Sequence, residues 1–213
     1  MWPESVQTQQ LLEDARHGTG GAVDQLLARH REPLRRMIAL RLDPALARRV
    51  DASDIVQEVL LDVNRRLADY LREPAMPFHL WIRQIAQDRI LDAHRRHRVA
   101  RRRSLDRERP LVRPADANSS SQDLAAALID PGLTPGSAVM REEFRQLFEA
   151  ALVQMDEDDR EVLLMRHAEH LSNQEVALAL HLTEAAAGMR YLRAIRRLRT
   201  ALAPRLGATS NHD

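Results

Sequence analysis

The sequence of 213 residues contains no cysteine, which excludes disulfide bonds and thiolate-bound metal sites. Aromatic residues make up only 3% of the chain, and runs of the strand-forming residues Val, Ile, Tyr and Thr are scarce. Leu, Ala, Arg and Glu dominate instead, and all four favour helix. The composition therefore predicts an all-α protein.

Long apolar runs are also missing, because no stretch approaches the roughly 20 apolar residues that cross a bilayer. The first ten residues lack the basic and then apolar layout of a secretory signal. We therefore expect no membrane insertion and a cytoplasmic location.

Lysine is absent as well: all 32 basic residues are arginine, and the net charge is only +1. The charge is unevenly distributed, since residues 89–103 and 190–205 each carry +6, whereas residues 156–161 contain five acids and one arginine. Arginine binds phosphates and base edges with two parallel hydrogen bonds, which lysine cannot do. The two basic segments are candidates for nucleic-acid binding, although a skewed genomic composition explains the missing lysine equally well.

Apolar residues recur at helical spacing through the first hundred residues. A period of about four over residues 55–67 predicts an amphipathic helix, with Asp51 or Ser53 as its N-cap. Residues 68–76 are predicted to form a loop, and the next helix is expected to begin near Pro77 and to run into the first basic segment.

Residues 104–138 differ from their surroundings, with four prolines, two glycines and a run of three serines. The stretch is longer than ordinary loops within a domain, which predicts a flexible linker. We therefore expect two small helical domains, residues 1–103 and 139–203, followed by a tail at 204–213.

The second domain contains the pattern of a helix-turn-helix over residues 172–199. Ser172 and Glu175 form a capping box, and the turn 181–183 leads into a long helix that Pro204 is expected to end. Arginines off the predicted buried stripe of this helix suit contacts to phosphates and base edges; they are Arg190, Arg193, Arg196 and Arg197. An αα-hairpin with a solvated basic face would show the same local pattern.

Several motifs in register resemble one family. Residues 51–59 are similar to the helix with which sigma factors grip the polymerase clamp, and residues 77–96 to the helix that melts and reads the −10 element. Residues 155–177 and 190–199 look like the domain that reads the −35 element. The order, the spacing and the proline-rich connector resemble RNA polymerase sigma factors of the extracytoplasmic-function (ECF) type, within the sigma-70 family.

The resemblance implies a transcription initiator that binds core RNA polymerase and promoter DNA, has no catalytic site or cofactor, and is a candidate partner for an anti-sigma factor. The implied polymerase contacts are Asp54, Gln57 and Glu58. The implied −10 contacts are Trp81, Asp88, Arg89, Arg95 and Arg96. Residues 1–103 would carry both of these surfaces, and residues 139–203 would read the −35 element.

The residues alone leave alternatives open. Trp81 has helical spacing with Ile85, so it fits the core as well as a stack on DNA, and Asp88 would repel a nearby phosphate. The sequence also allows a standalone helix-turn-helix regulator that needs no polymerase contact, or an adaptor that binds only proteins.

Two histidine pairs have the spacing of metal ligands, His94 with His97 and His167 with His170. Neither pair is accompanied by cysteine or by a converging carboxylate. We therefore expect four solvent-exposed helix histidines and no metal site.

Overall fold

The structure is a computed structural model that describes residues 2, 3, 5–103, 148, 150–152 and 154–209, without the side chains of residues 44, 98–103 and 203–209. Every regular element in these ranges is a helix, which confirms the all-α prediction. The chain divides into two compact units, Met1–Ala117 and Asn118–Asp213. Within the described residues, no helix has both the length and the apolar character that a bilayer crossing requires.

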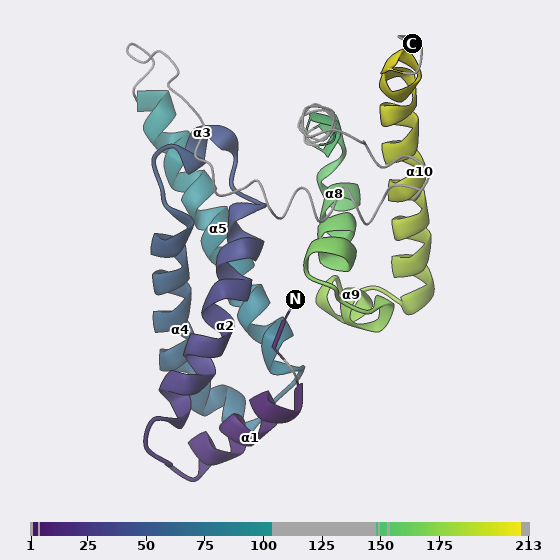
Figure 1. Cartoon of the computed structure of the whole chain (residues 1–213). Coiled ribbons are helices and arrows are strands. Elements are labelled where there is room, and N and C mark those ends of the chain that lie inside the picture. The colour runs from purple at the N-terminus through teal and green to yellow at the C-terminus, as the bar shows by residue number, and fades with distance from the viewer. Residues whose placement is uncertain (1, 4, 104–147, 149, 153, 210–213) are drawn as a thin grey trace. The chain divides into compact units, whose positions relative to one another are not determined.

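The first unit is built from helices that pack side by side (Figure 1). α2 and α5 both pack against α4 and also contact each other, and α1 packs against α2. The helices are α1 (Ser5–Arg16), α2 (Ala22–Ala39), α3 (Pro44–Ala47), α4 (Ala52–Arg72) and α5 (Phe78–Arg103).

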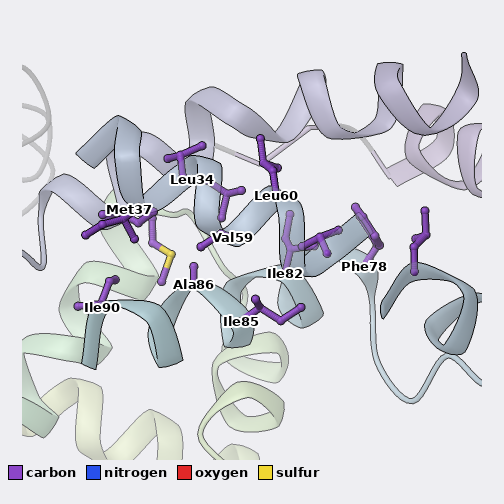
Figure 2. Packing of buried hydrophobic residues seen from close by; sticks show 14 of the residues in the cluster. Leu34, Met37, Val59, Leu60, Phe78, Ile82, Ile85, Ala86 and Ile90 are labelled. Carbon is purple, nitrogen blue, oxygen red and sulfur yellow. The ribbon is translucent and has the colours of Figure 1, made fainter. Parts of the chain in front are cut away.

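The core of this unit lies where α2, α4 and α5 meet, and Figure 2 shows their apolar side chains pointing toward one another. These side chains recur every three or four residues, so that each helix has one buried face. Burying one such side chain fully is worth about 1.5–3 kcal/mol. The labelled residues are Leu34 and Met37 of α2, Val59 and Leu60 of α4, and Phe78, Ile82, Ile85, Ala86 and Ile90 of α5.

α4 is longer than the sequence predicted. Asp51 is its N-cap, as one of the two expected alternatives, but the helix continues to Arg72, so the prediction of a loop over 68–76 is wrong for most of that range. Tyr70 explains the extension, because it carries the buried face one turn beyond Leu67 and is itself only 8% exposed. Its hydroxyl donates a hydrogen bond of 2.9 Å to the backbone oxygen of Met76, which fixes the short connection to α5.

The second unit contains α8 (Glu157–Leu163), the π-helix η3 (Leu164–Ala168), α9 (Asn173–Ala179) and α10 (Glu184–Thr209). α10 packs against both α8 and α9. The buried residues include Phe148, Leu163, Ala187, Ala194 and Leu198.

α10 does not end at Pro204, and this expectation from the sequence is wrong. The helical backbone continues through the proline to Thr209. A proline removes one backbone hydrogen bond of a helix, but helical turns on both sides can hold the backbone in place. The same occurs at Pro33, which lies inside α2 between the buried Leu26 and Met37.

The helix α5 is described as far as Arg103. The predicted linker 104–138 lies outside the described residues, as do residues 139–147. The predicted domain boundaries therefore stay predictions.

Candidate functional site

The first half of α4 presents a mixed stripe of two polar residues and one apolar residue to solvent. The Asp51 side chain caps the helix by accepting a 2.7 Å hydrogen bond from the backbone N–H of Ser53. Asp54 and Gln57 are exposed, and Leu61 is 57% exposed. Because these three positions are three and four residues apart, they lie along one face of the helix.

Glu58 lies beside this stripe, on the flank toward α5. One of its carboxylate oxygens is 3.3 Å from a guanidinium nitrogen of Arg96, and both side chains are substantially exposed. Exposed pairs of this kind contribute at most about 1 kcal/mol and weaken in salt. The structure thus brings together a predicted polymerase contact and a predicted −10 contact.

Arg89 is held against α4 by Asp62. Its Nε donates a 2.6 Å hydrogen bond to Oδ2 of Asp62, and a terminal guanidinium nitrogen pairs with the same oxygen. The Asp62 side chain is only 14% exposed, so water screens this pair less than a surface pair. The hydrogen bond that Arg89 donates to Asp62 raises the pKa of Arg89 above its ordinary value. The contact fastens α5 to α4.

The remaining charged −10 candidates face solvent on α5. Asp88 is exposed, and Arg95 is exposed with a guanidinium nitrogen 3.6 Å from the carboxylate of Asp92. A surface pair three residues apart on one helix is weak, so Arg95 is available to a phosphate.

Trp81 belongs to an aromatic cluster at the start of α5. Its ring stacks on Tyr70 of α4 with centroids 4.6 Å apart, and Phe78 meets Tyr70 edge to face at 5.4 Å. Burial raises the pKa of the Tyr70 hydroxyl. Trp81 is partly buried and packs against the hydrophobic core, which favours the interpretation of this residue as part of the core.

His30 of α2 lies beneath the same cluster. It is 1% exposed, its Nδ1 donates a 2.8 Å hydrogen bond to the backbone oxygen of Leu26, and its ring meets Phe78 at 5.0 Å. Burial is the main reason that the pKa of His30 is lowered to about 4, and the nearby positive charge of Arg29 acts in the same direction. Trp2 lies 6.3 Å from His30 between ring centroids. This buried histidine was not predicted, although its position four residues from both Leu26 and Leu34 was an available signal.

The helix-turn-helix of the second unit is formed as predicted. The capping box is complete, because the Ser172 hydroxyl accepts from the Glu175 N–H and the Glu175 carboxylate accepts from the Ser172 N–H. His181 in the turn has a φ of 54°, a left-handed conformation that His adopts more readily than most residues. Thr183 then caps α10, its hydroxyl accepting a 3.2 Å hydrogen bond from the N–H of Ala186.

Two of the four arginines predicted to read the −35 element are tied to α8. One nitrogen of Arg197 lies 2.6 Å from carboxylate oxygens of both Asp156 and Asp159, and hydrogen bonding to Asp159 raises the pKa of Arg197. Arg190 lies 3.5 Å from Asp158. These contacts were not predicted, although the acidic segment 156–161 was an available signal.

Arg193 and Arg196 differ from the other two. Both are exposed, and no carboxylate among the described residues pairs with either guanidinium. They lie on the side of α10 away from the buried Ala187 and Ala194. Their charges are therefore available to a polyanion.

The predicted solvent exposure of the histidine pairs is wrong for His94, His97 and His167, which are all half-buried. His94 Nε2 donates to the backbone oxygen of Arg41 at 3.2 Å, and His167 Nε2 lies 2.9 Å from the hydroxyl of Tyr191. Burial lowers the pKa of His167. These ring nitrogens link α5 to the turn after α2 and η3 to α10. Among the described residues, no group of three potential ligands gathers around a metal position.

Two family models match the chain. The model for Sigma-70 region 2 matches residues 27–107, and the model for Sigma-70, region 4 matches residues 145–198. Together these matches cover more than half of the chain.

Curated sigma factors match along most of the chain. The RNA polymerase sigma-H factor of Pseudomonas aeruginosa is 26% identical over 204 residues, which are 94% of this chain and 96% of that protein. The probable RNA polymerase sigma factor RfaY of Xanthomonas campestris pv. campestris is 34% identical over 163 residues, or 76% of this chain. The match spans only 36% of the length of RfaY.

Two solved structures share the fold. One is the structure of CnrH in complex with the cytosolic domain of CnrY, with a TM-score of 0.59 and 22% identity over 93% of this chain and 98% of that chain. The other is the sigma factor RpoE in complex with the anti-sigma factor NepR from Bartonella quintana, with a TM-score of 0.57 and 19% identity over 86% and 98%. With both region models matched in order, the chain belongs to the sigma-70 family: it is an RNA polymerase sigma factor of the ECF type, which binds core polymerase and directs transcription initiation.

Proposed function

We propose that the two units divide promoter recognition between them. Residues 1–103 bind core polymerase and recognise and melt the −10 element, residues 139–203 recognise the −35 element, and residues 104–138 tether them. The observation that carries this proposal is the difference between two exposed surfaces. α4 offers Asp54 and Gln57 to a basic partner, whereas α10 offers Arg193 and Arg196 to an acidic one.

In the first unit, Asp54, Gln57 and Glu58 contact the polymerase, and Arg95 and Arg96 hold the −10 strands. Asp88 adjoins this surface on the exposed side of α5. Arg89 and Trp81 act by positioning α5. The contact of Arg89 with Asp62 and the stacking of Trp81 on Tyr70 support this role.

In the second unit, Arg193 and Arg196 contact the −35 DNA directly. Arg190 and Arg197 lie beside these two residues and hold α10 against α8. The ion pairs of Arg190 with Asp158 and of Arg197 with Asp159 support this role. Once the helix is docked, the exposed part of either side chain can reach a backbone phosphate.

The chain works as a regulator without a catalytic centre, in the cytoplasm, where core polymerase acts. An anti-sigma factor is a further partner, because the similar structures of CnrH and RpoE are complexes with CnrY and with the anti-sigma factor NepR. A standalone helix-turn-helix regulator is not favoured, since it needs no region 2 and the chain matches that region.

The absence of cysteine allows a direct test of the division of labour. Gln84→Cys on α5 and Thr200→Cys on α10, both exposed, can each carry a single iron chelate that generates hydroxyl radicals and cuts nearby DNA. In the reconstituted holoenzyme, we expect cutting at the −10 element from residue 84 and at the −35 element from residue 200. Cutting of the same element from both positions would contradict the proposal.

A further inference from the structure

The outward face of α10 is apolar where the helix begins. Met189 is 60% exposed and Leu192 is 48% exposed, and Ala185 and Ala186 before them are exposed too. A single exposed apolar side chain needs no explanation. Two large ones within one turn of a helix that also carries exposed arginines point to a surface that is covered when the protein works.

Contacts on either side of the helix define where Met189 points. Ala187 and Ala194 mark the buried side, and Arg190 is drawn toward α8. Gly188 faces α9, since a Cβ at this position would lie 3.7 Å from the side-chain oxygen of Asn173. At about 100° per residue, Met189 lies opposite the buried side and between these two flanks. It is therefore an outermost residue of α10.

Arg193 and Arg196 continue the same stripe, four and seven positions after Met189. An apolar side chain that is followed by exposed arginines fits the major groove of DNA. Phosphates line the edges of this groove, and the C5-methyl group of thymine is the apolar feature of its floor. A protein partner would instead have to supply an apolar patch together with acids. The charge of the stripe favours DNA as the occupant.

We propose that Met189 contacts the C5-methyl group of a thymine in the −35 element and makes that base pair a determinant of promoter specificity. This inference rests on the proposed role of residues 139–203. Methionine suits the contact because its unbranched thioether chain adapts to the groove. Burying one methyl group against it strengthens binding about fourfold.

The test uses the reconstituted holoenzyme and a duplex library that is randomised over the −35 region. Each thymine of the selected element is then replaced by deoxyuridine, which removes only the methyl group. We expect the wild-type holoenzyme to lose about fourfold in affinity at one position. The Met189→Ala holoenzyme should bind the thymine and deoxyuridine duplexes equally well.

Leu178→Ala is the matched control, because Leu178 is 41% exposed but lies on α9. This variant should discriminate thymine from deoxyuridine as the wild type does. A selected element without thymine, a wild type that is indifferent to every replacement, or a Met189→Ala variant with undiminished discrimination would overturn the inference alone. A library that yields no −35 element at all contradicts the proposed function itself, and the inference falls with it.

Discussion

Arg197 of α10 shares one guanidinium nitrogen between Asp156, at the start of α8, and Asp159, each at 2.6 Å. The Asp159 side chain is 4% exposed, so its charge is stabilised only while the arginine stays in place. The contact fastens the recognition helix to α8. It thereby fixes the directions of Met189 and Arg193.

The arginines of α10 should separate into two classes on substitution. Arg197→Ala leaves Asp159 buried and unpaired, so we expect the melting temperature followed by circular dichroism to fall by several degrees. Arg193→Ala should leave the melting temperature almost unchanged, because an exposed side chain without a partner adds little stability. It should instead weaken −35 binding by the holoenzyme. The slope of log affinity against log salt concentration should become shallower by about one. Equal melting temperatures for the two variants would contradict the assignment.

The Asp62–Arg89 pair should show coupling in a double-mutant cycle. From Asp62→Ala, Arg89→Ala and the double variant, we expect an interaction free energy of about 1 kcal/mol, because Asp62 is largely shielded from water. Both tryptophans, Trp2 and Trp81, lie in the first unit, so urea unfolding followed by tryptophan fluorescence reports this unit.

The pair Asp69–Arg72 is the matched control for this cycle. Both of its side chains are about three-quarters exposed, and its interaction free energy should stay below about 0.5 kcal/mol. If the two cycles gave the same small value, Asp62 would not hold Arg89.

His30 should make the first unit sensitive to acid. Its pKa is lowered from 6.5 to about 4 in the folded chain, so between these pH values the unfolded chain binds more protons than the folded one. The contribution of His30 to the free energy of unfolding is therefore complete above about pH 6.5 and is lost as the pH falls toward 4. The loss between pH 7 and pH 5 should be about 2 kcal/mol in urea unfolding followed by tryptophan fluorescence.

Replacing the buried imidazole tests this pH dependence. His30→Gln should remove most of the loss between pH 7 and pH 5, whereas substitution of His17, which is 73% exposed, should leave it intact. If the free energy of unfolding of His30→Gln fell as much between pH 7 and pH 5 as that of the wild type, other groups would cause the acid sensitivity.

The outer stripe of α4 should carry the affinity for core polymerase. Asp54→Ala combined with Gln57→Ala should weaken binding to purified core by about tenfold or more, because both side chains lie on the face proposed for the contact. Asp69→Ala removes the same charge from an exposed position near the far end of α4 and should bind core normally. Circular dichroism should show both variants folded. If the two variants bound core polymerase with equal affinity, Asp54 and Gln57 would not form the contact.

Features that depend on a few consecutive residues could be predicted from the sequence. The capping box at Ser172 and Glu175 is set by a four-residue pattern, and the left-handed conformation of His181 follows from the tight turn in which it lies. The buried stripes of α4 and α10 follow from spacing alone. The resemblance to sigma factors then indicated the family, and it implied a polymerase-binding surface and DNA-binding surfaces.

Features that depend on how helices dock could not be predicted. Arg89 and Asp62 are 27 residues apart and Arg197 and Asp156 are 41 apart, so no local pattern shows which arginines are already paired. The extension of α4 through Tyr70 depends on the stacking partner Trp81. The π-helix η3 likewise has no signature in local helix propensity.

The central claim is that this chain lets core RNA polymerase start transcription at promoters that the core cannot find alone. The direct measurement is run-off transcription from a template with −10 and −35 elements selected by the holoenzyme, with purified core in the presence and absence of the chain. The account predicts a discrete transcript only when the chain is present, and its loss with Asp54→Ala combined with Glu58→Ala. If the folded chain neither binds core at low salt nor raises the transcript above the level of core alone, the account is contradicted.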